Sequence, residues 1–227
     1  MILPSVFYTV ALLLVGATNA AQYCDPVTSV CYSETKAGDL YVRVAIPAVD
    51  KDPFDMLLQL VAPKATAGWA AIAWGGKMVK NPITLAWANG NNTVVSSRWA
   101  DTRTPPVPYP SATYTVLKGS TSNSTHWTLT ALCSQCAAWT ADNAKSALNP
   151  NDKAAKFAYA LSPTPPSQPA NNASSITKHT IHATFTLDLA AAKTEKFEEY
   201  ITSLGSTNKG SWEGKDGKWV RKRPVWS

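Results

Sequence analysis

Met78 is the first residue in this chain whose type and position suggest chemistry. It lies in AWGGKMVKNPITLAW (residues 73–87), where two apolar runs flank a short loop with two glycines and two lysines. Such a loop should be polar and hydrated, so a thioether there needs an explanation. Met can fold back to fill an irregular gap in a core. It can also act as a soft ligand for a metal such as haem iron. The loop alone leaves both explanations open.

A histidine late in the chain is the second candidate ligand. His179 opens HTIHATFTLDL (179–189), whose alternating pattern predicts a β-strand. Alternation puts His179 on an apolar face with Ile181, Ala183, Phe185, Leu187 and Leu189. The opposite face receives Thr180, His182, Thr184, Thr186 and Asp188. His182 is therefore expected to be a solvated surface residue, whereas His179 fits either a core or edge position or a ligand.

Together, Met78 and His179 would supply one thioether and one imidazole, each at the end of a predicted strand. Such a pair can hold a haem iron from its two axial sides. Gly75 and Gly76 would let the backbone approach a bulky planar group closely. The two candidate ligands are too far apart in sequence to form a motif by themselves.

No hydrolytic machinery is expected. Besides His179 and His182, the chain has one other histidine, His126. It has no G-x-S-x-G or H-E-x-x-H motif. Its 15 acidic residues do not single out a catalytic pair. No glycine-rich loop precedes a predicted helix, so a phosphate site is not indicated.

The elements that must position these residues are mostly strands. Apolar or alternating runs, separated by clusters of Pro, Gly, Asn and Ser, predict strands at 40–46, 56–62, 69–74, 83–88, 93–100, 112–118, 126–133, 156–162 and 179–189. Short strands without intervening helices predict an all-β fold, an antiparallel two-sheet β-sandwich of the immunoglobulin-like kind. One short C-terminal helix is expected at 190–204, before Gly205, and a shorter helical piece at 141–148.

The chain divides into three parts. Residues 1–20 have an uncharged apolar block and small residues before a cleavage site, which predicts a secretory signal peptide. Residues 21–205 form the predicted domain, and 206–227 form a basic tail that we expect to be flexible. No later segment is long and apolar enough for a membrane span, so we expect a secreted, extracellular protein.

Cysteines and sequons agree with export. Four cysteines allow three pairings, of which we favour Cys24–Cys31 and Cys133–Cys136 over a zinc site with four thiolates. Cys136 is followed by Ala137 rather than His, which argues against covalent haem attachment. N-glycosylation sequons begin at Asn91, Asn123 and Asn172.

The formal net charge is +6, and part of the excess lies in KWVRKR, residues 218–223. A basic run beside tryptophans can attract an acidic partner. For a secreted protein we do not expect a nucleic-acid partner.

Four stretches, in order, carry a family resemblance. They are YCDPVTSVCYS, WAAIAWGGKMVKNPITLAWANGNNTVVSSRWA, HWTLTALCSQCAAW and ITKHTIHATFTLDLAAA. Over roughly residues 22–205 the chain resembles the fungal extracellular b-type cytochrome domains of cellobiose dehydrogenases, within the DOMON-like β-sandwich group. We expect a single-domain protein without the flavin domain.

The resemblance implies a cofactor and a role. It implies noncovalent haem b with Met78 and His179 as axial iron ligands. Relatives often carry Gly where this chain has Ala183, which adds only a methyl group. The implied function is electron transfer, with an extracellular flavin dehydrogenase as donor and a copper polysaccharide oxygenase or ferric iron as acceptor. Any enzymatic activity would be ferric reduction.

An alternative function belongs to another class. DOMON-like sandwiches can bind carbohydrate, and nine tryptophans would suit stacking against sugars. A haem-free carbohydrate-binding module would be colourless, as would a structural wall protein.

Overall fold

The structure, a computed structural model, describes residues 21–50, 53–205, 212–215 and 218–221. The predicted signal peptide, 1–20, lies outside the described residues. Within the predicted tail, 206–227, strands β17 (Trp212–Lys215) and β18 (Lys218–Arg221) pair as an antiparallel hairpin. The flexibility of this tail stays a prediction.

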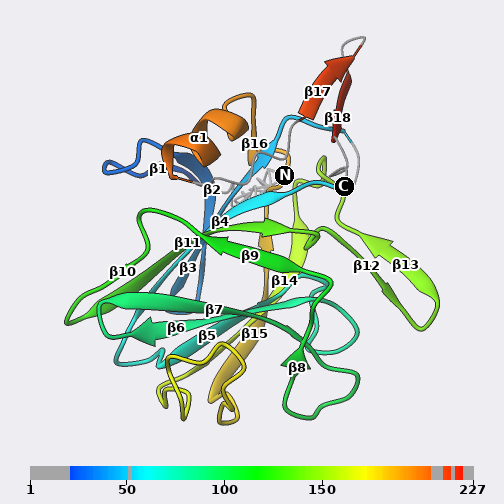
Figure 1. Cartoon of the computed structure of the whole chain (residues 1–227). Helices are drawn as coiled ribbons and strands as arrows, with labels where there is room; N and C mark the ends of the chain where they lie inside the picture. The colour runs from blue at the N-terminus through cyan, green and yellow to red at the C-terminus, as the bar shows by residue number, and fades with distance from the viewer. Residues whose placement is uncertain (1–20, 51–52, 206–211, 216–217, 222–227) are drawn as a thin grey trace, which may run out of the picture.

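Two sheets make up the body of the protein (Figure 1). The eight-stranded sheet contains β1 (Ala21–Cys24), β2 (Cys31–Ala37), β3 (Leu40–Pro47), β4 (Met56–Pro63), β9 (Thr113–Val116), β10 (Thr121–Ser122), β11 (His126–Ser134) and β16 (Lys193–Thr194). The six-stranded sheet has the order β15 (Ile181–Leu187), β14 (Ala155–Ser162), β5 (Trp69–Ala73), β6 (Ile83–Asn89), β7 (Asn92–Trp99) and β8 (Val107–Pro108).

The predicted antiparallel β-sandwich is confirmed. Neighbouring strands pair antiparallel in both sheets, apart from the short parallel contact of β16 with β3. The main core lies between the sheets, because each strand turns alternate apolar residues inward. The predicted apolar face of 40–46 is fully buried there, with Leu40, Val42, Val44 and Ile46 at 0% exposure.

A helix covers the outer face of the larger sheet. The helix α1 (Phe197–Ser203) buries Phe197, Tyr200 and Ile201 against a cluster that includes Leu57 of β4. Gly205 follows the helix with a φ of 85°, as expected for a residue just beyond a helix C-terminus. The predicted helix start at 190 is wrong, because residues 193–194 pair with β3 before the helix begins.

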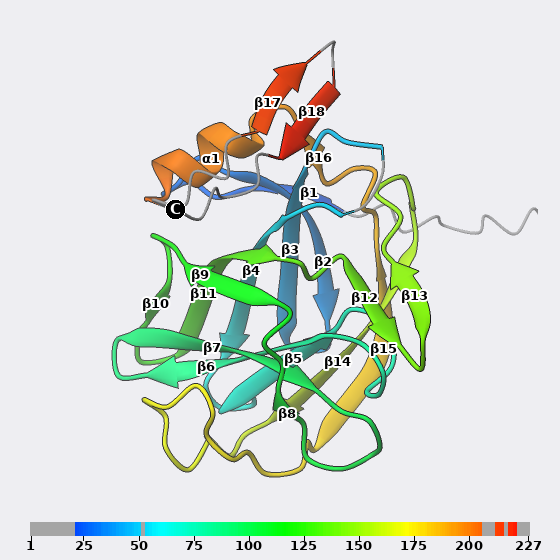
Figure 2. The same cartoon turned by 45° about the vertical axis from the view of Figure 1, so that its right-hand side comes forward.

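The second predicted helix, at 141–148, is also wrong. Strands β12 (Ala138–Ala141) and β13 (Ala144–Ala147) form an antiparallel hairpin there, outside the two main sheets (Figures 1 and 2). Asp142 and Asn143 make the two-residue turn with φ angles of 49° and 63°. Asp and Asn tolerate this left-handed conformation, which two-residue hairpin turns require.

The structure joins the cysteines in the two local pairs that we favoured. One disulfide joins Cys24 of β1 to Cys31 of β2, which pair across the two strands. The other joins Cys133, near the end of β11, to Cys136, which follows that strand. None of the helices among the described residues is long and apolar enough to cross a membrane.

Candidate functional site

The outer face of the six-stranded sheet, away from the main core, carries the candidate site. Directly paired residues in an antiparallel sheet point to the same face, so the pairing register shows which side chains lie together. One row across this face reads His182, Ala160, Ala71, Leu85 and Ser96. The neighbouring row reads Thr184, Ala158, Ala73, Ile83 and Arg98.

Four small side chains form the centre of this face. Ala71 and Ala73 of β5 lie beside Ala158 and Ala160 of β14, and we call these residues the alanine patch. Adjacent strands are about 4.8 Å apart, and alternate residues of one strand about 7 Å apart. Methyl groups at this spacing leave a flat apolar surface, bordered by the larger side chains of β6.

Met78 packs at one end of the alanine patch. Its half-buried side chain contacts the apolar cluster that includes Trp69, Ala71 and Ala73. Its loop leaves β5 at the end where β14 begins, since Gly76 lies against the backbone carbonyl of Lys156. Met78 therefore lies in the loop after β5, as the sequence predicted, and its side chain packs on an apolar cluster.

The two histidines lie toward the opposite end of the patch. The N–H of Thr180 donates to the carbonyl of Leu161, which places the start of β15 beside the end of β14. His182 follows within β15, directly opposite Ala160. His179 precedes the strand and is half-buried, and its ring makes an edge contact with the His182 ring at 4.6 Å between centroids.

One prediction about the histidines is wrong. We expected His182 on the face opposite to His179, but their rings touch. Alternation holds only within a strand, and β15 begins at Ile181, so His179 lies outside the pattern. His182 is exposed as expected, but it lies on the side of the alanine patch.

Burial favours the ligand form of His179. Burial lowers the pKa of its imidazole, and electrostatic interaction with His182 and Lys178 lowers this pKa further. A lowered pKa keeps the ring neutral, and the neutral ring is the form that binds a metal.

Buried side chains of the same sheet hold the loop that leads to His179. Arg98 is only 4% exposed, and its guanidinium donates to the carbonyls of Asn172 and Ser174 at 2.9 and 2.8 Å. Trp87 donates its indole N–H to the carbonyl of Pro169 at 2.7 Å. No carboxylate in the described part of the chain forms an ion pair with Arg98, and burial lowers the pKa of this guanidinium. The sequence analysis missed both residues.

The donor set and the surface between the donors fit haem. A thioether and imidazoles lie toward opposite ends of an apolar surface, and this combination would suit an apolar cofactor whose iron takes soft ligands from two sides. Trp69, at the edge of the patch, is 2% exposed, and its buried indole N–H has no partner in the described protein. Buried donors normally have an acceptor, so this orphan N–H indicates that the face receives a further group.

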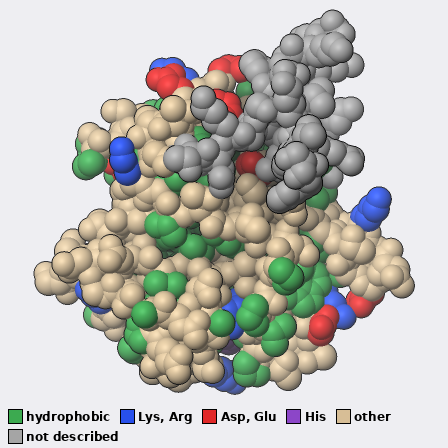
Figure 3. Space-filling model, in the orientation of Figure 1, with side chains coloured by type: hydrophobic (Ala, Val, Ile, Leu, Met, Phe, Trp, Pro, Cys, Tyr) green, Lys and Arg blue, Asp and Glu red, His purple; other side chains and the backbone are tan. Residues whose placement is uncertain are grey.

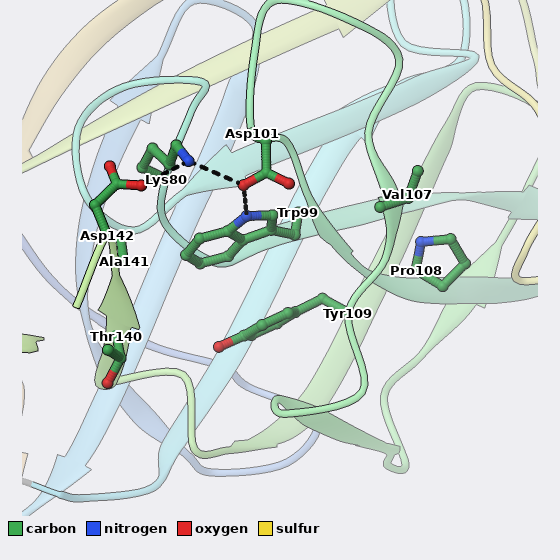
Figure 4. A pocket seen from close by; sticks show the side chains of 9 residues that line it. All are labelled: Lys80, Trp99, Asp101, Val107, Pro108, Tyr109, Thr140, Ala141 and Asp142. Carbon is green, nitrogen blue, oxygen red and sulfur yellow. Dashed lines mark hydrogen bonds and ion pairs between the residues drawn. The ribbon is translucent and has the colours of Figure 1, made fainter. Parts of the chain in front are cut away.

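A surface pocket of about 340 Å³ lies beyond the Met78 loop, between the end of β7 and the β12–β13 hairpin (Figure 4). The ammonium of Lys80 bridges Asp101 at 3.2 Å and Asp142 at 2.8 Å. Trp99 and Tyr109 stack beneath this bridge with 4.9 Å between ring centroids. Figure 3 shows acidic and basic side chains beside hydrophobic ones at the lower right of the molecule.

The bridge shifts the pKa values of Lys80 and Asp101. Hydrogen bonds to Asp142 and Asp101 raise the pKa of Lys80. The hydrogen bonds from Trp99 and Lys80 lower the pKa of Asp101. These shifts keep Lys80 and Asp101 charged at neutral pH, and the bridge ties the residue two positions after Met78 to the tip of the hairpin.

The three sequon asparagines lie away from this pocket and from the core. Asn91, Asn123 and Asn172 are exposed in the structure, so each is accessible for modification. Their glycosylation stays a prediction.

Comparison with known families decides what kind of protein this is. The family model for the cytochrome domain of cellobiose dehydrogenase matches residues 23–199. The chain belongs to this family. Cytochrome domains of the cellobiose dehydrogenase type bind haem b noncovalently and transfer electrons, which agrees with the fit of the site.

This cytochrome domain is similar to a curated relative and to a solved structure. It is 29% identical over 204 residues to a pyrroloquinoline quinone-dependent pyranose dehydrogenase of Coprinopsis cinerea, covering 86% of this chain and 27% of that protein. The crystal structure of the cytochrome b domain of pyranose dehydrogenase from the same organism matches with a TM-score of 0.72 and 25% identity, over 81% of this chain and 94% of the other.

A further solved structure supports the fold alone. The cytochrome domain of Myriococcum thermophilum cellobiose dehydrogenase matches with a TM-score of 0.75 at 18% identity, over 84% of this chain and 99% of that one. The sandwich is therefore retained while the sequence has diverged widely.

Proposed function

We propose that this cytochrome domain is a secreted one-electron carrier whose haem b iron is held by Met78 and His179. The observation that carries the assignment is the position of the two side chains, at opposite ends of the alanine patch on one sheet face. The contact of His182 with His179 makes His182 the alternative imidazole.

Haem supplies reversible one-electron redox chemistry when bound. Met78 would be a neutral soft ligand that favours ferrous iron and so raises the reduction potential relative to two histidines. With His179 on the other side, both axial positions would be filled. Neither oxygen nor an organic substrate would then bind the iron, which favours electron transfer over oxygen activation.

The alanine patch and the buried cluster around Trp69 would exclude water from one side of the cofactor. The unpartnered indole N–H of Trp69 would donate a hydrogen bond to a polar group of the cofactor. A dry environment with few charges near the iron also favours the reduced state, which carries less charge.

The proposed donor is an extracellular dehydrogenase, by analogy with relatives in which a cytochrome domain belongs to a sugar-oxidising dehydrogenase. This chain spans 27% of the length of the matched pyranose dehydrogenase. One class of donor is a flavin enzyme. A second class is a quinone enzyme, since the matched pyranose dehydrogenase depends on pyrroloquinoline quinone. The proposed acceptors are a copper polysaccharide oxygenase or ferric iron.

The test is a spectrum followed by a transfer assay. Purified protein should show a Soret band with one haem per chain. Dithionite should reduce the haem, and the reduced haem should not bind carbon monoxide. Catalytic amounts of a sugar-oxidising flavin or quinone dehydrogenase with its sugar should also reduce it, and a copper polysaccharide oxygenase should reoxidise it. A colourless protein that takes up no haem would instead support the carbohydrate-binding alternative.

A further inference from the structure

The loop that carries Met78 is held together by one buried amide. Asn81 is completely buried, and its side-chain oxygen accepts a hydrogen bond from the N–H of Gly75 at 2.8 Å. Its amide nitrogen donates to the carbonyl of Lys77 at 2.6 Å and to that of Val79 at 2.9 Å. Lys77 and Val79 are the residues immediately before and after Met78. A single side chain thus binds both carbonyls that flank the proposed ligand.

The surrounding packing shows that the loop is built around this amide. A Cβ atom at Gly75 would lie 2.8 Å from the Cβ of Asn81 and 3.0 Å from the ring of Trp139, so the close approach requires glycine. Lys80 adopts a φ of 62°, a left-handed conformation that is costly for a residue with a side chain. Such a conformation persists only where neighbouring contacts enforce it.

Lys80 supplies those contacts from the other side. Its backbone N–H donates to the carbonyl of Ala100 at 2.9 Å, and its own carbonyl accepts from the indole N–H of Trp139 at 3.1 Å. Its ammonium bridges Asp101 and Asp142, as Figure 4 shows. The segment is therefore fixed at Gly75 and again at Lys80, while Met78 itself lies between these anchors.

We propose that Asn81 is the positioning residue for Met78, holding its thioether where it can reach the haem iron. This inference rests on the proposed function, because it takes Met78 as the ligand. A thioether is a weak neutral ligand, so its occupancy depends on how well the loop is arranged before it binds. Outer hydrogen-bond partners of metal ligands typically change affinity by about 10- to 100-fold.

The test compares Asn81→Ala with Gln59→Ala in the haem-loaded protein. Gln59 is the matched control, since it is 1% exposed, makes three side-chain hydrogen bonds and lies in the other sheet. Both variants should lower the melting temperature. Only Asn81→Ala should lower the reduction potential, weaken the sulfur-to-iron charge-transfer band and raise the carbon monoxide-binding fraction of ferrous protein by about tenfold or more.

A variant of the same volume separates the loss of the two donors from the loss of packing. Asn81→Asp keeps the volume and the acceptor for Gly75, and its ionised carboxylate has no donor and repels the two carbonyls beside Met78. In haem-free protein, amide exchange at Gly75 should stay slow in Asn81→Asp and become fast in Asn81→Ala. The haem-loaded Asn81→Asp protein should show the same loss of Met ligation.

Met78→Ala separates the two possible failures. If Met78→Ala leaves the spectrum and potential unchanged, the ligand assignment is wrong and the positioning role is overturned with it. If Met78→Ala opens the iron to carbon monoxide but both Asn81 variants retain the wild-type potential and exclude carbon monoxide, the assignment stands and Asn81 has only a structural role.

Discussion

The segments that carry the two proposed ligands are attached to the same sheet by different means. The Met78 loop is closed from within, by an amide three residues away along the chain. The loop before His179 is held from outside, by Trp87 and Arg98 of β6 and β7, whose bonds span 82 and 74 residues of sequence. The first arrangement is local, whereas the second exists only when the whole sheet has assembled.

This difference predicts two kinds of failure. Loosening a local loop should change how its ligand binds the iron while the fold stays intact. Loosening a long-range anchor should release part of the sheet face, together with the cofactor that we propose binds there. The following changes are ordered from the largest expected effect to the smallest.

The largest effect is expected for His179→Ala. Loss of the imidazole should weaken haem binding by more than about a hundredfold, because losing even an outer partner of a ligand costs about 10- to 100-fold. Titration of haem-free protein with haem, followed by the Soret band, measures this. His182→Ala is the paired variant and should retain haem. If only His182→Ala loses haem, the second histidine of the touching pair is the ligand.

Met78→Ala should have the next largest effect. The protein should keep its haem through His179 but gain an open iron position, so ferrous protein should bind carbon monoxide. The reduction potential should fall, since the thioether stabilises ferrous iron. Redox titration and carbon monoxide difference spectra check both results. Retention of the wild-type potential would show that Met78 only fills the core.

Arg98→Lys tests the outside anchor. Lysine keeps the charge but cannot donate to several carbonyls at once, and each lost charged hydrogen bond costs about 1.5–3 kcal/mol. We expect the free energy of unfolding to fall by roughly 2–3 kcal/mol and haem to dissociate faster, while the potential of the bound haem stays unchanged. Denaturant unfolding and haem transfer to apomyoglobin measure these quantities. The exposed Arg103→Lys is the control.

The smallest effect is expected for Lys80→Gln. The ammonium bridges carboxylates that are largely exposed, and ion pairs in such settings contribute little. The melting temperature should fall less than in Arg98→Lys, and the difference should shrink as salt is added. A salt-independent loss of Met ligation in this variant would mean that the bridge, rather than Asn81, controls the loop.

Local patterns in the sequence predicted most of the long strands, whereas the assignment of the ligands stays a prediction. Apolar residues alternate along 40–46 because one face of the strand is buried, and this pattern can be read from the sequence of that strand alone. The turn at Asp142 was missed because alanines and lysine around it also suit a helix. Residue type and position at strand ends suggested the pairing of Met78 with His179, and family resemblance was needed to support it, since separation in sequence carries no distance information.

Asn81 and Arg98, which support the two segments, could not be predicted from the sequence for a physical reason. Asn81 and Arg98 act through backbone carbonyls, and every residue has one, so no residue type marks the partner. Arg98 within a strand predicts a solvated charge, whereas the folded chain buries it beneath the loop around Asn172. The touching histidines were assigned to opposite faces because the strand was expected to begin at 179 rather than at Ile181.

The position of both proposed ligand segments on one sheet would make the haem an internal optical probe of that sheet. Figures 1 and 2 place α1 and the strands β5, β6 and β7 at opposite ends of the molecule. Proteins open in cooperative units of different stability rather than all at once. Absorbance of the haem should therefore follow the opening of the six-stranded sheet. Unfolding of α1 at the other end would lower the far-UV ellipticity of the protein at a lower temperature and leave the haem absorbance unchanged. The difference between the two melting curves would map how the sandwich comes apart.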